Sequence, residues 1–385
     1  MLRFPLDLVE SWTSRMVNFQ HATELQTLAD RLSTTANRDI VEHVALIRLA
    51  ANQPPWQVTG LQLRQGQSYS LFSRGRVHWA TAKARQGGAF SQTPLYGDAS
   101  FHLWARIGAG GRIQNGCADS ASFIADCDGQ LELGIYMGMW DGEHGKLTHT
   151  EHYRDLSGEI SVVVVAWRKN ATEALLCIDN RLPLPPLLVQ ERTRVTRNYR
   201  PPKGWHYLTE TGNNDIFHFD TRAPSAQINV DAQNAQGIIR HPVDIALTPA
   251  IKINWQWRLD AHPSIGPEDR ARFHDYVSLG LEFCNGRDLT WIWSRYLSRD
   301  HHFACPVKDW SARETHYVLR TNDDDNGHWT FDSRNVYSDV EISQGPPPTK
   351  IVAVWLIAVS TFSHRRLRAS FKDIYFSGDC DRQVL

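Results

Sequence analysis

The sequence lacks the short motifs that identify many enzyme classes. Its six cysteines form no CxxC pair and no zinc-ligand spacing, and its seventeen histidines include no HxH or HExxH pattern. No GxSxG elbow or Walker loop is present, and the glycine-rich stretch at 108–111 is typical of a turn because it opens no helix. We therefore expect neither a metal ion nor another cofactor.

The sequence also lacks a basic excess and a long apolar run. The formal net charge is −1, so we expect no nucleic-acid partner. The longest apolar run, Ile351 to Val359, is nine residues and too short to span a bilayer, so we expect no membrane partner. Arg3, Asp7 and Glu10 interrupt what would be the apolar part of a secretion signal, which favours a cytoplasmic protein with free thiols.

Apolar residues and tryptophan are abundant instead. Hydrophobic residues make up 42% of the 385 residues, enough for large cores in two or three domains. The chain holds 14 tryptophans, which need either a sandwich core or an aromatic-lined cleft to cover them.

Residues 1–52 are predicted to form a helical segment. Apolar residues recur at helical spacing from residue 22 to residue 50, with a break near 33–37, and the prolines at 54–55 end the second helix. A short helical pair needs a surface on which to pack. We expect a brace on a sheet, or a dimerisation element that would make the protein a homo-oligomer.

Two β-rich regions follow. In residues 56–170, short alternating strands are separated by glycine turns, and the run ISVVVVAW at 160–167 predicts a strand that is buried on both faces. Residues 178–204, rich in proline and arginine, are interpreted as a linker, and residues 205–385 as a second β domain. The expected fold is mainly β, with two jelly-roll-like β-sandwich domains after a short N-terminal helical segment, packed through a tryptophan-rich junction.

The first β domain resembles the galactophilic lectins of the LecA-like (PA-IL-like) type. The resemblance rests on QVTGLQLRQGQSYSLFSRGRV, LWARIG, CDGQLELGIY and LSGEISVVVV, in that order within residues 57–167. It implies a jelly-roll sandwich that binds a sugar through calcium. Met137-Gly138 and Arg154-Asp155 stand where those lectins carry their calcium ligands, and only Asp155 is suited to that cation, so we expect no metal in this domain.

The second β domain resembles a bacterial family of unknown function, DUF3047. The resemblance covers residues 205–376 and rests on GIIRHPVDIAL, INWQWRLD, YVSLGLEF, LTWIWS, HYVLRTND, HWTFDSRNVYSD and IVAVWLIAVS. It implies a jelly-roll-like sandwich and supplies no established activity. The segment STFSHRRLRAS, at 360–370, is basic where the family is usually acidic.

Strand parity sorts the side chains of the second domain into apolar and polar faces. In 252–261, 276–283 and 289–294, one face is apolar or aromatic and the other is polar. If these strands share a sheet, the polar faces form one ligand-binding surface, which bears Gln256, Arg258, Tyr276, Glu282 and Ser294. Gly280 would leave room for a ligand over its strand. The alternative is a solvated face with a weak Arg258–Glu282 ion pair.

The sequence offers three candidates for a catalytic residue, which are Glu282, His152 and His316. Each histidine precedes a tyrosine, a pair that could abstract and return a proton, although neighbouring residues of one strand point to opposite faces.

The leading functional hypothesis is recognition of a carbohydrate or another small molecule by tandem lectin-like sandwiches. The alternative is an intracellular, metal-independent lyase, hydrolase or cyclase of natural-product or glycan metabolism, with its site in the tryptophan-rich cleft between the domains. A scaffold that assembles through the N-terminal helices is a third hypothesis.

Overall fold

A computed structural model describes the protein. The described residues are 21–385 with the exception of 80–96, 99–102, 116–118, 136–139, 142–143, 148–149, 151–152, 155, 179–180, 198, 209–214, 223–224, 234, 271–275, 307–309, 323, 325, 361–362, 364 and 380–381. The chain divides into two compact units, Met1–Asn198 and Tyr199–Leu385.

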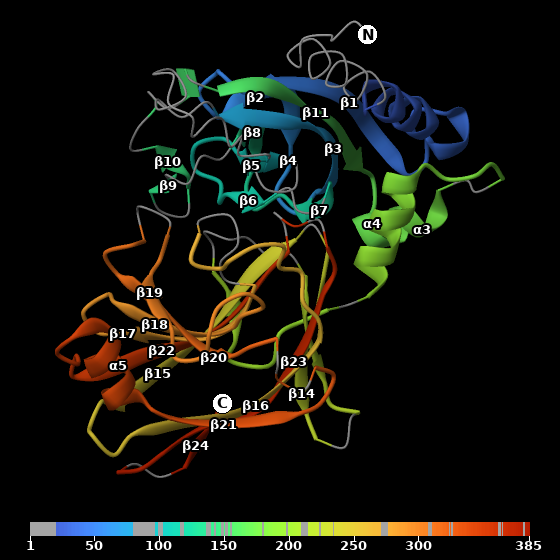
Figure 1. Ribbon diagram of the computed structural model, residues 1–385. Helices are drawn as coiled ribbons and strands as arrows, with labels where there is room; N and C mark the ends of the chain where they lie inside the picture. The colour runs from blue at the N-terminus through green and yellow to red at the C-terminus, as the bar shows by residue number, and fades with distance from the viewer. Residues whose placement is uncertain are drawn as a thin grey trace, which may run out of the picture. The chain divides into compact units, whose positions relative to one another are not determined.

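The N-terminal unit is built from two main β-sheets (Figure 1). The five-stranded sheet contains β1 (Val41–Ala50), β11 (Leu156–Trp167), β3 (Ser68–Trp79), β4 (Gly97–Asp98) and β7 (Ser120–Ile124). The four-stranded sheet contains β2 (Gln57–Leu63), β8 (Gly129–Ile135), β5 (Leu103–Ile107) and β6 (Gln114–Asn115). A small ribbon pairs β9 (Trp140–Asp141) with β10 (Lys146–Leu147).

The core of this unit lies between the two main sheets. Leucine and isoleucine side chains of β2, β5 and β8 pack there against β1, β3 and β11. Within β11, Val162 and Val164 face this core, while Val163 and Val165 face a second apolar layer on the other side of the sheet. Burial on both faces explains why this strand is a continuous apolar run, as the sequence predicted.

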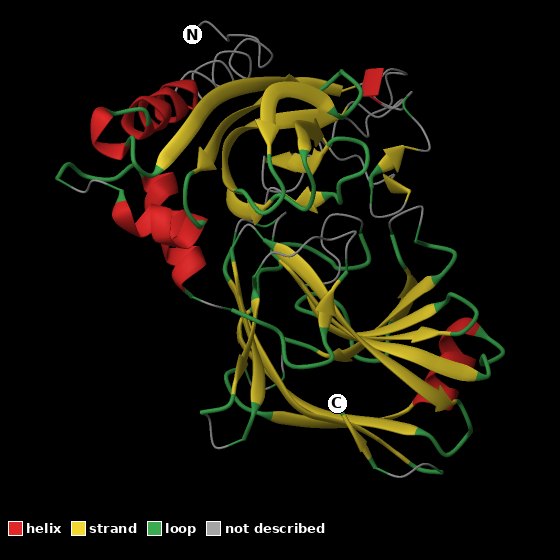
Figure 2. Cartoon of the chain, turned by 180° about the vertical axis from the view of Figure 1, so that it is seen from behind, coloured by secondary structure: helices red, strands yellow, loops and turns green. Residues whose placement is uncertain are grey.

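The second apolar layer is helical. Residues 21–32 form a helix whose Leu25, Leu28 and Leu32 pack against the sheet, followed by a 3-10 turn, η1 (Thr35–Asn37). Two further helices, α3 (Ala171–Cys177) and α4 (Pro186–Thr196), join the same layer (Figure 2). The first of these helices braces a sheet, as the sequence predicted.

Two segments differ from the sequence-based expectation. Residues 41–50 form strand β1 rather than a second helix. Because this strand is covered on both faces, with Leu49 toward the core between the sheets and Val44 and Leu46 toward the helices, its apolar residues do not alternate and mimic helical spacing.

The second difference is in the predicted linker, residues 178–204, which contains helix α4. The proline at the first helical position is compatible with a helix, because the first N–H groups of a helix have no partner within it. Leu187 and Leu188 are buried against the sheet, so much of this segment belongs to the N-terminal unit.

The C-terminal unit is a sandwich of two larger sheets, which form two layers in Figure 1. The seven-stranded sheet has the order β12 (His206–Tyr207), β15 (Gln236–Ala246), β22 (Lys350–Val359), β17 (Val277–Phe283), β18 (Asp288–Trp293), β20 (Glu314–Arg320) and β19 (His302–Ala304). The six-stranded sheet contains β13 (Phe217–Asp220), β14 (Gln227–Ala232), β23 (Leu367–Ser377), β16 (Lys252–Ala261), β21 (Thr330–Asn335) and β24 (Gln383–Val384).

Four tryptophans dominate the core between these two sheets. Trp255 and Trp257 of β16 face Trp291 and Trp293 of β18, with ring centroids 5.6 and 5.3 Å apart. All four are fully buried. The indole nitrogens of Trp257 and Trp291 donate to carboxylates at the edge of the core, in the second case on helix α5 (Val336–Gln344).

The fold prediction is confirmed, since the chain is mainly β and forms two β-sandwich units after a short N-terminal helical segment. Among the described helices, none is long and apolar enough to cross a membrane.

Candidate functional site

The five predicted ligand-binding residues do not form one surface. Gln256 and Arg258 lie on β16 of the six-stranded sheet, whereas Glu282 lies on β17 of the seven-stranded sheet. Tyr276 precedes β17 and Ser294 follows β18. The expectation that these strands share a sheet was therefore wrong, because the chain crosses from one layer of the sandwich to the other between β16 and β17.

On the outer face of the six-stranded sheet, the charged and amide groups hold one another. Gln256 donates to Asp373 Oδ2 at 2.9 Å, and Arg258 Nε lies 3.1 Å from Asp260 Oδ1. Arg258 and Lys372 both lie over the ring of Trp329, at 5.2 and 4.3 Å from its centroid. This face resembles a solvated sheet surface with its own local partners.

Tyr276 and Ser294 belong to a buried network. Ser294 Oγ donates to Glu268 Oε2 at 2.7 Å and accepts from the backbone of Leu297. Tyr276 is buried next to His262, with ring centroids 5.7 Å apart, and burial raises the pKa of its phenol. These contacts order the segments around the sheet and give both residues a structural role.

The face of the seven-stranded sheet that points away from the tryptophan core carries a row of acidic side chains. Strand register places Glu282 beside Asp288, and Asp288 beside Glu314, on neighbouring strands β17, β18 and β20. The next row of the same face holds Trp355, Gly280, Thr290 and His316. We call this surface, which also includes Ser278, Arg240 and Cys305, the polar face.

Asp288 is at the centre of the acidic row and is fully buried. Burial raises its pKa to about 7; the Arg313 guanidinium opposes the shift, and Glu314 and Glu282 add to it. Its one ion-pair contact among the described residues is with Arg313 Nε at 3.5 Å, while Glu282 accepts from Arg240 Nε at 2.9 Å. The acidic row is thus flanked by two arginines.

Several polar atoms of this face have no hydrogen-bond partner among the described residues. They are Ser278 Oγ, Thr290 Oγ1, Trp355 Nε1 and both carboxylate oxygens of Asp288. Buried polar groups are nearly always hydrogen-bonded, so four such side chains on one sheet face require an explanation. Contacts that only stabilise the fold do not explain why these four polar side chains are buried without hydrogen bonds.

The edges of the polar face are less buried than its centre. Arg240 and Glu282 are partly exposed, and so is Arg313, which lies over the ring of half-buried Trp310 at 4.4 Å. Trp310, Leu208 and Ile238 also pack around the apolar patch formed by Ala353, Trp355 and Ile357. Charged and aromatic groups therefore meet at this rim.

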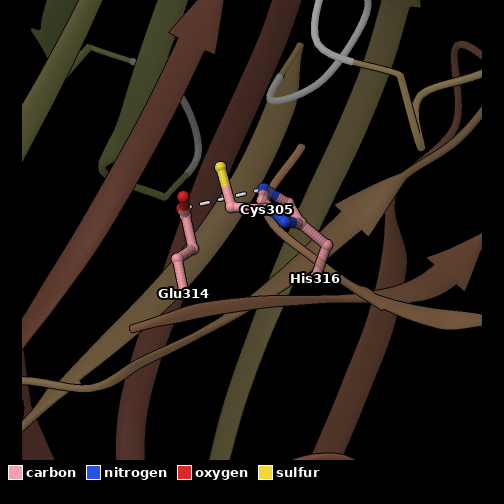
Figure 3. A group of neighbouring side chains, drawn as sticks. All are labelled: Cys305, Glu314 and His316. Carbon is pink, nitrogen blue, oxygen red and sulfur yellow. Dashed lines mark ion pairs between the residues drawn. The ribbon is translucent and has the colours of Figure 1, made fainter. Parts of the chain in front are cut away.

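Cys305, Glu314 and His316 converge at one end of the polar face (Figure 3). Their potential ligand atoms all lie within 4.8 Å of one another, and His316 Nε2 is 3.7 Å from Glu314 Oε1. The ring of Phe303 stacks on that of His316 with centroids 5.0 Å apart. Among the described residues, these three are the ones arranged to hold a metal ion.

Two of the three catalytic candidates, Glu282 and His316, lie on this polar face. His152 lies outside the described residues. Gly280 does not open space for a ligand, because a Cβ atom placed there would lie 3.0 Å from Thr290 Oγ1 and 3.6 Å from Trp355 Cβ. Its missing side chain instead makes room for these two neighbours.

Sequence reasoning missed Asp288, Glu314 and Cys305. Parity in DLTWIW puts Asp288 on the same face as Thr290, one step before the first residue that we sorted. The same rule pairs Glu314 with His316 in ETHYVLR. Cys305 had no local signal, because it meets Glu314 only through the pairing of two strands.

Comparisons with known proteins match parts of the chain. Residues 203–375 match the model of DUF3047, a protein family of unknown function. A comparison with curated proteins found no match. The resemblance of the second β domain to DUF3047 is thereby confirmed, and a PllA-like lectin is among the similar solved structures.

Three of the similar solved structures cover part of this chain. The N-terminal domain of EclA, a PllA-like lectin, has 18% identity and a TM-score of 0.22, covering 34% of this chain and 98% of its own. The xyloglucanase domain of NopAA from Sinorhizobium fredii has 8% identity and a TM-score of 0.30, and the match covers 47% of this chain and 96% of that domain. The family 30 carbohydrate-binding module of a Clostridium thermocellum cellulase has 10% identity and a TM-score of 0.26, and the match covers 48% of this chain and 96% of that module.

Proposed function

We propose that the polar face of the C-terminal unit binds a polyhydroxylated small molecule of the carbohydrate class. The observation that carries the proposal is the set of buried polar groups on this face, Ser278, Thr290, Trp355 and Asp288, whose polar side-chain atoms make no hydrogen bond with a described protein group, although Asp288 lies 3.5 Å from Arg313. A ligand with several hydroxyl groups, each able to donate and accept, matches such a set of donors and acceptors.

The charges of the face fit the same ligand class. Glu282 and Asp288 accept hydrogen bonds from hydroxyl groups, and the two flanking arginines donate them. Hydrogen bonds to charged groups contribute about 1.5–3 kcal/mol, more than those between neutral groups. Trp310, at the partly exposed rim, offers an aromatic ring to the apolar side of a sugar.

The other candidate surfaces support binding less well. On the outer face of the six-stranded sheet, Gln256 donates to Asp373 and Arg258 is ion-paired with Asp260; Arg258 Nε is the one buried atom of these two side chains that makes no hydrogen bond among the described residues. In the N-terminal unit, Ser120 and Ser122 donate to buried Glu191, whose carboxylate also accepts from Arg194. We therefore assign recognition to the C-terminal sandwich rather than to both sandwiches in tandem.

The test is a glycan array with the full chain, followed by titration calorimetry with the strongest glycan found. Asp288→Ala is expected to weaken binding about tenfold or more, since it removes a charged hydrogen-bond acceptor. Thr290→Val keeps the side-chain shape and removes a hydroxyl group without a described partner, so it is expected to weaken binding several-fold without loss of stability. Gln256→Ala is the matched control.

Two outcomes would contradict this function. One is a wild-type protein that binds nothing on arrays of neutral and acidic glycans. The other is binding that is lost in Gln256→Ala or Arg258→Ala and kept in Asp288→Ala, which would move the site to the six-stranded sheet.

The acidic row also supports an enzyme as the second candidate function. A carboxyl group with a pKa of about 7 stays partly protonated at neutral pH, and Asp288 has such a group beside Glu282. One carboxylic acid and one carboxylate are the pair that glycoside hydrolysis requires. Asp288→Asn separates the two functions: the amide keeps one acceptor oxygen, so it would weaken glycan binding less than Asp288→Ala does and would abolish any release of reducing ends.

A further inference from the structure

The end of the polar face next to strand β19 brings together three side chains of different chemistry. Glu314 and His316 are two residues apart on β20, so they project from the same face of the sheet. The backbone N–H of Cys305 donates to the carbonyl of Glu314 at 2.9 Å, which continues the pairing of β19 with β20 and sets Cys305 opposite Glu314. The backbone itself therefore produces the convergence seen in Figure 3.

The distances match a small coordination sphere. Two ligands held at about 2.1 Å from a tetrahedral metal ion are roughly 3.4 Å apart. The separation of 3.7 Å between His316 Nε2 and Glu314 Oε1 is close to that value, and the cysteine sulfur completes a group in which all ligand atoms lie within 4.8 Å. Small side-chain rotations would close the remaining gap.

The three side chains are also buried together. The exposed fractions of Cys305, Glu314 and His316 are 2%, 4% and 0%. Within the described part of the chain, no second group of three such side chains comes this close together.

The donor set selects the type of ion. Calcium and magnesium prefer oxygen ligands, whereas zinc and cobalt accept thiolate, imidazole and carboxylate together. A site with three protein ligands leaves a fourth position for water or a substrate. Phe303, stacked on the His316 ring, restricts its rotation and so favours one orientation of the donor nitrogen.

We propose that Cys305, Glu314 and His316 form a zinc-type site with three protein ligands and an open fourth position. The ion would lie beside the acidic row, because Asp288 is the strand neighbour of Glu314. A hydroxyl group of the ligand would occupy the fourth position; this last step rests on the proposed function, and the metal site itself does not.

The test is a titration of the full chain with Co²⁺ alone, after removal of bound metal with a chelator. The wild-type protein is expected to take up one Co²⁺ and to show a thiolate-to-cobalt charge-transfer band and the strong visible bands of four-coordinate cobalt. Zn²⁺ is expected to displace it. Cys305→Ser should remove the charge-transfer band, and His316→Gln should weaken Co²⁺ binding at least tenfold.

The matched control is Cys284→Ser, which changes an exposed cysteine of the same unit and should leave the spectrum unchanged. Circular dichroism and thermal unfolding show whether each variant is folded. If Cys305→Ser does not fold, the wild-type spectrum and the loss of Co²⁺ affinity in Glu314→Gln test whether these residues bind the ion. A wild-type spectrum of six-coordinate cobalt without a thiolate band, or an equal loss in Cys284→Ser, would overturn the proposal.

Metal binding and glycan binding are measured independently. Wild-type Co²⁺ uptake with a silent glycan array would leave the metal site standing and remove the proposed function. Glycan binding without Co²⁺ uptake would leave the proposed function standing and remove the metal site.

Discussion

The two sheets of the C-terminal sandwich share one core but differ in the faces that point away from it. On the six-stranded sheet, Gln256 and Arg258 reach partners on their own surface. On the seven-stranded sheet, Asp288 and Thr290 are buried and lack a hydrogen-bond partner among the described residues. Strands β16 and β18, which carry these residues, look alike in sequence, because apolar and polar residues alternate in both. The pattern alone therefore does not distinguish a solvated face from a candidate site.

The difference between these two faces indicates that polar groups which do not stabilise the fold are gathered on the seven-stranded sheet. A buried carboxylate that makes no hydrogen bond, as in Asp288, costs stability even beside an arginine, and such groups persist where function requires them. In the core between the sheets, three of the four tryptophans donate a hydrogen bond, and Trp255 Nε1 has no hydrogen-bond partner among the described residues. Trp257 donates to Asp332, whose carboxylate is held by Arg320, and Trp291 donates to Asp339, held by Arg334.

The largest expected effect comes from breaking the core that both sheets share. Trp257→Ala removes a fully buried ring and the hydrogen-bond donor of Asp332, so it should lower the free energy of unfolding by about 3–5 kcal/mol. Trp329→Ala, on the outer face, should lower it by about 1 kcal/mol or less. Urea unfolding at neutral pH measures both; similar losses would contradict the division into core and outer face.

Acidification should weaken the link between the sheets. His262 follows β16 and contacts the carbonyl of Trp293 on β18 through Nε2, while its Nδ1 accepts from the N–H of Ser264. This pair of bonds requires the neutral ring. Burial lowers the pKa of His262 from 6.5 to about 4, so the folded state binds the proton more weakly than the unfolded chain does.

Stability from His262 is therefore fully present above pH 6.5 and is lost as the pH falls toward 4, by no more than about 3 kcal/mol. His262→Gln should reduce this dependence in urea unfolding between these pH values. His328→Gln, at an exposed position, is the control. An unchanged pH dependence in His262→Gln would show that other groups cause it.

A smaller effect is expected at the close contact within the polar face. Gly280→Ala places a methyl group 3.0 Å from Thr290 Oγ1 and should lower the free energy of unfolding by about 1–3 kcal/mol. Combining it with Thr290→Ala should recover part of that loss, since the clash is removed. Additive losses in the double variant would show that the hydroxyl group is not the obstacle.

The smallest effect is expected on the outer face of the six-stranded sheet. Arg258→Ala removes an ion pair and a cation–π contact at a partly exposed site, so the stability should fall by less than about 1 kcal/mol. Glycan affinity should be unchanged. A large loss of affinity in calorimetry would reverse the comparison between the two faces.

The sequence predicted much of the fold and part of the candidate site. Glycine spacing and alternation indicated two β-rich domains, and the run at 160–167 indicated a strand buried on both faces. Parity gave residues 252–261 an apolar or aromatic face, and the two tryptophans of that face, Trp255 and Trp257, are fully buried in the core. Strand β1 was misassigned because a strand covered on both faces loses its alternation.

The candidate site was only partly predictable. Glu282 and His316 were identified by residue type and parity, but their common surface depends on which strands are neighbours. Parity gives the face on which a side chain lies within its own strand and gives no information on the partner strand. That is why Gln256 and Arg258 were grouped with Glu282, although they lie in the other layer of the sandwich.

By itself, the sequence determined that the chain is mainly β and which residues of a strand share a face, because backbone propensity and hydrophobic alternation act over a few residues. Only the tertiary structure decided that Asp288 lies between Glu282 and Glu314 and that Cys305 meets His316. These neighbours are set by hydrogen bonds between strands whose order in the sheet differs from their order in the chain. The chemistry of the polar face therefore exists only once the seven-stranded sheet has assembled.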